Sequence, residues 1–98
     1  MSLIISPAIA AKIAGDDHGN VTEKEVHECF VNHCGGYAYD KRPQHLDGNG
    51  NPSPWFVEKT NHGRILKIMF VHDGKDVYLK SAYPATDAVQ KLFKENER

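Results

Sequence analysis

Residues 64–83 hold two runs of alternating apolar residues on either side of Asp73 and Gly74. An Asp-Gly pair between two such runs is the strongest short-range signal for a β-hairpin, because a tight turn needs residues that accept positive φ angles. The segment therefore predicts two long antiparallel strands near 64–71 and 76–83. Such a hairpin needs further strands beside it and a layer that covers one face of the sheet.

The turn also predicts which side chains of the hairpin face each other. A two-residue turn at 73–74 places Lys67 opposite Lys80, and it places Arg64 opposite Tyr83 on the other face. Like charges that face each other across two strands repel, by about a few tenths of a kcal/mol. Facing lysines therefore indicate either a solvated sheet face or a place where an anion binds.

The preceding turn, at 62–63, positions the strand before the hairpin. A two-residue turn there places Glu58 opposite Lys67, whereas a three-residue turn would place Val57 opposite Lys67 and mix the two faces. We therefore predict the shorter turn. The resulting row across three strands consists of Glu58, Lys67 and Lys80, with Tyr78 one diagonal step away.

Two stretches near the N-terminus carry helix start signals. Ser6 followed by Pro7 is typical of a helix N-terminus, and Gly15 marks the end of that helix. Thr22 and Glu25 form a capping box, and apolar residues at helical spacing follow it.

The order of the elements places the chain in the α+β class. A closing helix can begin at Thr86, before a charged end at 94–98 that we expect to be frayed. The expected strands cover residues 37–42, 55–61, 64–71 and 76–83, with a short strand possible at 3–6 and a loop at 46–54. This order predicts a twisted, four-stranded antiparallel sheet with N-terminal helices and a C-terminal helix packed on one face.

Length and composition fit a single domain that spans residues 1–98. No apolar run approaches the ~20 residues that cross a bilayer, and the chain starts without a signal-peptide pattern, so we expect a cytoplasmic protein without membrane contact. The net charge is −1, yet residues 59–80 carry five Lys/Arg against two Asp/Glu, a local charge of +3. This favours an anionic ligand at one place over broad coating of nucleic acid.

The row of lysines suits phosphodiester chemistry. Cations stabilise the charge that builds on phosphoryl oxygens, and a carboxylate or a phenol can carry protons. His45, close to Asp40 and Arg42 at a strand end, is a further candidate proton carrier, although an exposed loop histidine has the same pattern. The simpler interpretation of the row is a solvated face on which Glu58 and Lys67 form a surface pair contributing about 0.2–1 kcal/mol.

Four segments follow one another in a recognisable order: HGNVTEKEVHECF (18–30), YDKRPQH (39–45), GRILKIMF (63–70) and YLKSAYPAT (78–86). Together they resemble the BrnT-like toxins of bacterial type II toxin–antitoxin modules, which are small members of the RelE/ParE-like fold. The chain departs from the family pattern at Tyr83, where the family has the arginine of a Ser-Ala-Arg segment, and at the extra residue Asn20.

The resemblance implies a RelE-like fold and a metal-independent ribonuclease that cuts mRNA without a cofactor, with the 2′-OH of the RNA as nucleophile. The implied partners are RNA and a small DNA-binding antitoxin protein. The residues expected around the scissile phosphate are Arg64, Lys67, Lys80 and Tyr83, with Glu58 or His45 as the general base. The residues expected to bind RNA beside them are Arg42, Lys59 and Tyr78.

Two other interpretations remain open. The same fold could serve as a non-catalytic module, for example a phage or host-interaction protein, that binds a protein or a nucleic acid through the basic hairpin. His27, Cys29, His33 and Cys34 lie within eight residues and suggest zinc. However, Cys29 and His33 belong to the apolar stripe of the helix, and no second pair follows at a zinc-site spacing. We therefore predict no metal site.

Overall fold

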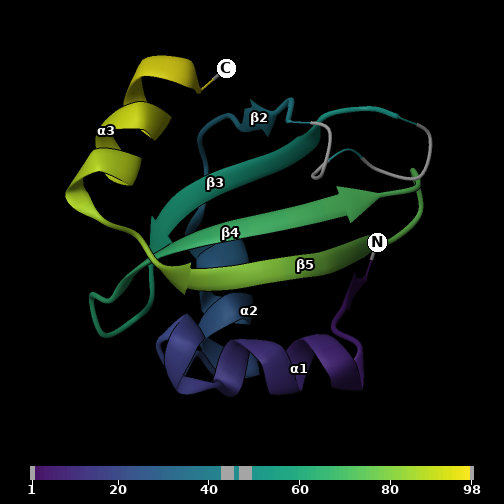
Figure 1. The fold of residues 1–98 in the computed structure, drawn as a ribbon, viewed down its shortest axis with the longest axis vertical. Coiled ribbons are helices and arrows are strands. Elements are labelled where there is room, and N and C mark those ends of the chain that lie inside the picture. Colours follow the sequence, from purple (N-terminus) through teal and green to yellow (C-terminus); the bar gives the residue numbers. More distant parts are fainter. Residues whose placement is uncertain (1, 43–45, 47–49, 98) are drawn as a thin grey trace.

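The computed structural model describes all residues except 1, 43–45, 47–49 and 98. Its elements are β1 (Leu3–Ile4), α1 (Pro7–Ala14), the 3-10 helix η1 (Asp16–His18), α2 (Glu23–Asn32), β2 (Ala38–Asp40), β3 (Ser53–Lys59), β4 (Ile65–His72), β5 (Val77–Pro84) and α3 (Asp87–Asn96). The strands form one sheet in the order β1-β5-β4-β3-β2 (Figure 1). The predicted α+β class is therefore confirmed. No helix in the described part of the chain is long and apolar enough to cross a membrane.

The sheet is five-stranded and mixed, so the predicted four-stranded antiparallel sheet is wrong. β1 runs parallel to β5, with Leu3 beside Val77 and Ile4 beside Tyr78, whereas the other neighbouring strands are antiparallel. A two-residue strand is too short to show an alternating pattern, and its partner lies near the other end of the chain. Local sequence signals therefore do not reveal this pairing.

The helices lie on both sides of the sheet, not on the single face predicted. Phe30 of α2 packs edge-on against Phe56 and Phe70, with ring centroids 5.0 and 5.5 Å apart. Phe93 of α3 lies 5.5 Å from Trp55, which precedes Phe56 in β3 and so points to the opposite face. Figure 1 shows α2 behind the long strands and α3 beside β3. We call the side with Phe56 the helix face and the other side the Trp55 face.

The predicted helix starts are confirmed. Ser6 accepts a backbone N–H bond in the first turn of α1. The capping box is complete, because the N–H of Glu25 donates to Thr22 Oγ1 at 3.1 Å and the N–H of Thr22 donates to Glu25 Oε1 at 3.0 Å. Thr86 caps α3, and this helix includes residues 94–96, which we had predicted to be frayed.

Two strand boundaries differ from the predicted ones. β2 is limited to Ala38–Asp40, inside the strand expected at 37–42, and β3 begins at Ser53, inside the segment expected to be a loop (46–54). Residues 47–49 of that loop lie outside the described residues.

The connection between β3 and β4 is a three-residue turn, so the predicted two-residue turn is wrong. A 2.8 Å backbone hydrogen bond between residues 60 and 64 closes it, and Gly63 has a φ of 85°. A three-residue hairpin loop with glycine in the left-handed region is common, because that residue restores the strand direction. Val57, not Glu58, consequently faces Lys67.

The connection between β4 and β5 is shifted from the predicted turn at 73–74. His72 pairs with Val77, and within the 73–76 loop the N–H of Asp73 donates to the carbonyl of Asp76 at 3.3 Å, so the tight turn lies at 74–75. Asp73 Oδ1 accepts the backbone N–H groups of Lys75 and Asp76 at 2.9 and 2.8 Å. An aspartate that binds the backbone in this way fixes the position of the turn, and the Asp-Gly pair alone does not show that the turn begins one residue later.

A β-bulge in β5 changes the register again. The pairing of β4 with β5 shifts by one residue between Met69 and Phe70, which leaves Lys80 as the extra residue. Lys67 therefore faces Tyr83, and the predicted pairings of Lys67 with Lys80 and of Arg64 with Tyr83 are both wrong.

The core lies between the sheet and its helices and contains aliphatic and aromatic side chains from both. Its buried residues include Ile13, Val21, Val26, Cys29, Trp55, Phe56, Leu66, Ile68, Phe70 and Phe93.

Arg64 ties the segment before α2 to the start of β4 on the helix face. Its guanidinium donates to the Glu25 carboxylate at 3.0 and 3.1 Å and to the carbonyl oxygens of Gly19 and Asn20. Burial alone would raise the pKa of Glu25. The hydrogen bonds from Thr22 and Arg64, together with the charge of Arg64, outweigh burial and hold the pKa below its usual value.

We expect Glu25→Gln to lower the free energy of unfolding by about 1 kcal/mol at neutral pH and to have little effect near about pH 3. Because the folded pKa of Glu25 lies below its unfolded value, its contribution is complete above the unfolded pKa and is lost as the pH falls through the folded pKa. Urea unfolding at several pH values measures this. The matched control is Glu23→Gln, which removes the same charge from the same helical turn. Equal pH profiles for the two variants would contradict the role of Arg64.

Candidate functional site

A lysine is buried in the middle of the sheet on the Trp55 face. Lys67 is only 7% exposed, and its Nζ lies 4.5 Å from the centroid of the Trp55 ring and 5.5 Å from that of Tyr83. Within the described part of the chain, no carboxylate forms an ion pair with it. A cation over aromatic rings is stabilised by roughly 0.5–2 kcal/mol, and a position of low local dielectric strengthens its attraction to a negative charge. An anion that reached this position would therefore interact favourably with Lys67.

Tyr83 lies beside Lys67 because the β4–β5 register pairs the two residues. The ring of His18 makes an edge contact with the ring of Tyr83. The two ring centroids are 6.3 Å apart, and the two ring planes form an angle of 72°. His18 belongs to η1, so a residue from the N-terminal third of the chain reaches the edge of this site.

Arg42, which follows β2, is a second cation near Tyr83. Arg42 donates two side-chain bonds to Asp40, at 3.0 Å from Nε and 2.6 Å from the terminal nitrogen. The hydrogen bonds and the charge of Asp40 raise the pKa of Arg42, and the nearby Tyr83 adds to this effect. The Asp40 side chain is 6% exposed and that of Arg42 is 58% exposed. Asp40 thus holds a solvent-facing guanidinium in a fixed direction.

The bulge turns Lys80 towards the same face. Its Nζ donates to Ser53 Oγ at 3.3 Å, and Ser53 pairs with Asp40 across β2 and β3. The Trp55 face therefore carries three cationic side chains, a phenol and two polar residues that position them. We call this set the polar cluster: Asp40, Arg42, Ser53, Lys67, Lys80 and Tyr83.

Two of the predicted catalytic residues lie elsewhere. Arg64 is on the helix face in the ion pair with Glu25, so the expectation that it projects away from the lysines is confirmed. Glu58 is also on the helix face, where its carboxylate lies 3.2 Å from His33 Nδ1. The predicted row of Glu58, Lys67 and Lys80 is wrong, because the three-residue turn moves Glu58 to the other side of β3.

Tyr78 and Lys59 do not join the cluster. Tyr78 donates to Asp73 Oδ2 at 3.0 Å near the 73–76 loop, and this bond raises the pKa of Tyr78. Lys59 is exposed at the end of β3. His45, the other candidate general base, lies outside the described residues.

Cys29 of α2 and His33 at its C-cap take structural positions, whereas His27 and Cys34 are exposed. Cys29 is buried, and burial, followed by the charges of nearby glutamates, raises the pKa of its thiol to about 12. The His33 ring stacks on Phe56 with centroids 4.3 Å apart, and Nε2 donates to the carbonyl of Gly36 at 2.8 Å. Among the described residues, no three His, Cys, Asp or Glu side chains gather as metal ligands would.

Several residues of the site were not assigned to it by sequence reasoning. Trp55 is a buried core residue that pairs with Met69, and its ring lies against Lys67. His18 belongs to a non-repetitive segment, and Ser53 lies in an expected loop, so neither carries a signal that could place it here.

No family model, curated protein or solved structure matches this chain. The resemblance to BrnT-like toxins therefore stays a prediction.

We expect Lys67→Met to raise the free energy of unfolding by about 1 kcal/mol, because methionine fills similar space without placing a charge in a largely buried position. Denaturant unfolding measures the change. Lys75→Met, in the exposed 73–76 loop, is the control for removing one positive charge and is expected to leave stability unchanged within about 0.5 kcal/mol. A Lys67→Met protein that is clearly less stable than the natural one would show that the ammonium has a favourable partner.

Proposed function

We propose that the polar cluster binds the phosphodiester backbone of RNA, and that the protein is a metal-independent endoribonuclease acting on mRNA. The observation that carries this proposal is the largely buried Lys67 side chain, whose ammonium is framed by two aromatic rings and unpaired with any described carboxylate. A phosphate would supply the missing negative charge, and its charge increases in the transition state, where a fixed cation stabilises it most.

The side chains of the cluster have complementary roles in this proposal. Lys67, Lys80 and Arg42 neutralise the phosphoryl oxygens. The 2′-OH of the preceding ribose attacks phosphorus, the bond from phosphorus to the 5′-oxygen breaks, and a 2′,3′-cyclic phosphate and a free 5′-OH result. The Tyr83 hydroxyl accepts the proton of the 2′-OH and passes its own proton to the departing 5′-oxygen, so the proton balance closes.

The resemblance supports the biological setting of the proposal. A BrnT-like toxin on a RelE-like fold acts in the bacterial cytoplasm and is neutralised by a small DNA-binding antitoxin. The α+β order of elements supports this proposal, and Lys67 and Tyr83 are cross-strand neighbours on one face of the sheet.

A non-catalytic RNA-binding module on the same fold is the second candidate. Asp40 already occupies the guanidinium of Arg42 through two bonds, and Glu58, the expected base, lies on the other face. Both features are compatible with a surface that holds RNA without cutting it.

Cleavage of mRNA by the purified protein tests the first proposal. We expect Lys67→Met to lower the cleavage rate about 10²–10³-fold, as removal of a charge-stabilising group does, and Tyr83→Phe to lower it at least about 10²-fold. Lys75→Ala, on the exposed loop of the same hairpin, is the matched control and is expected to cleave normally.

The outcomes separate the two candidates. RNA with 2′,3′-cyclic phosphate ends, together with growth arrest on induction that Lys67→Met abolishes, supports the ribonuclease. Binding of RNA without cleavage, lost in Lys67→Met, supports the binding module. A protein that neither binds nor cuts RNA would exclude both.

A further inference from the structure

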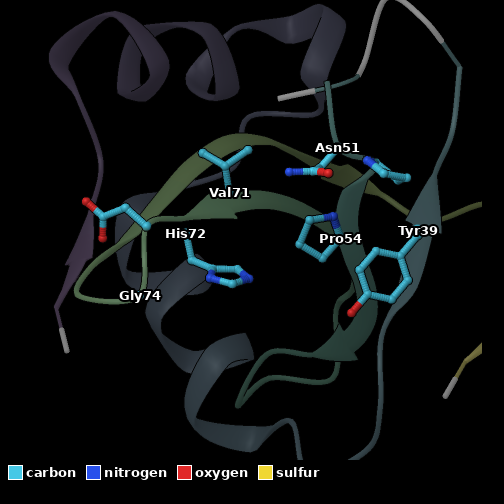
Figure 2. Close-up of a pocket in the computed structure, with 8 residues that line it drawn as sticks. Tyr39, Asn51, Pro54, Val71, His72 and Gly74 are labelled. Carbon is cyan, nitrogen blue, oxygen red and sulfur yellow. The ribbon is translucent and has the colours of Figure 1, made fainter. Parts of the chain in front are cut away.

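A hollow of about 480 Å³ opens at the end of the sheet where β2, β3 and β4 meet the 73–76 loop. Its walls include Tyr39, Asn51, Pro54, Val71, His72 and Asp73. Figure 2 shows the rings of Tyr39, Pro54 and His72 around one shared space. The polar cluster does not contribute to this hollow, so it is a separate feature of the surface.

The rings of the hollow extend an aromatic cluster of the core to the surface. Phe70 lies 6.4 Å from His72 and 5.3 Å from Tyr37, measured between ring centroids. Tyr39 is 50% exposed, a large fraction for a tyrosine beside a cavity. Flat, exposed rings that are fixed to a rigid sheet are the surfaces on which unpaired bases stack.

The position of Tyr39 connects the hollow with the polar cluster. Tyr39 and Asp40 are consecutive in β2, so their side chains point to opposite faces. β2 is the edge strand of the sheet, and the exposed cations Lys41 and Arg42 follow it directly. A chain that binds Arg42 through a phosphate can therefore cross this edge and bring its next group to Tyr39.

Charge indicates which part of such a chain enters the hollow. Hydrogen bonds from the backbone of Asp76 and Lys75 hold the pKa of Asp73 below its usual value, so the wall of the hollow carries a carboxylate, whereas Lys41 and Arg42 lie outside it. A phosphate would be repelled from the hollow and attracted to its rim. An uncharged, flat group with hydrogen-bonding edges fits the interior.

We propose that this hollow is a nucleobase subsite, in which Tyr39 and His72 stack on one base of a single-stranded RNA whose phosphates lie on Arg42 and the polar cluster. The inference rests on the proposed RNA-binding function and extends it across the edge of the sheet. It gives the protein contacts with a base as well as with the backbone.

Binding of a fluorescein-labelled, single-stranded RNA hexamer to Tyr39→Ala tests the subsite. We expect the dissociation constant to rise about tenfold, as loss of one base-stacking ring does. Tyr39→Phe keeps the ring and is expected to bind like the natural protein. Tyr39 is half-exposed, so both variants should fold, and circular dichroism checks this. Equal affinity of Tyr39→Ala and the natural protein would overturn the inference.

A second measurement distinguishes failure of the subsite from failure of the proposed function. Adenosine 5′-monophosphate and ribose 5-phosphate are added separately, and NMR follows the ring signals of His72 and Tyr39. Shifts with the nucleotide alone support the subsite even if the protein cuts no RNA. Equal shifts with both compounds, or no shifts with either, would overturn the subsite. Loss of hexamer binding in Lys67→Met would meanwhile support the proposed RNA backbone site independently.

Discussion

The pairing register of β4 determines which side chains can act together in this protein. A slip of one residue against β3 would exchange the neighbours of Lys67, because side chains alternate between the two faces. The three-residue turn with Gly63 in the left-handed region sets that register on one side, and the bulge at Lys80 sets it on the other. As a result, the cross-strand neighbours of Lys67 are Val57 and Tyr83. The ammonium of Lys67 therefore lies beside the rings of Trp55 and Tyr83, and not beside the carboxylate of Glu58.

Local signals predicted the elements well, because their physical causes are local. The caps at Ser6, Thr22 and Thr86 act within one helical turn, and each is visible in three or four letters of sequence. The registers were not predictable in this way. Two-residue and three-residue turns contain the same glycine, and the choice depends on how the whole strand packs. The parallel β1–β5 pair depends on contacts between the two ends of the chain.

About half of the candidate site could be predicted from the sequence. Lys67, Lys80, Tyr83 and Arg42 were expected and belong to one cluster, although through a different register. Arg64 and Glu58 were expected as well, but each has a polar partner contributed by α2 or its C-cap, Glu25 for Arg64 and His33 for Glu58. The sequence pattern shows that a residue is charged, and only the tertiary packing shows whether that charge is already neutralised.

The two faces of the sheet differ in the groups that contact their charged side chains, and this difference is the best guide to where a functional site lies. On the helix face, Arg64 lies against Glu25 and His33 lies against Glu58, so these groups hold elements together. On the Trp55 face, Lys67 is as deeply buried as a core residue, and among the described residues only rings contact its ammonium. Removing a charged group from water costs stability unless a partner compensates for it. In the proposed function that partner is a phosphate, and the polar cluster surrounds the position where it would bind.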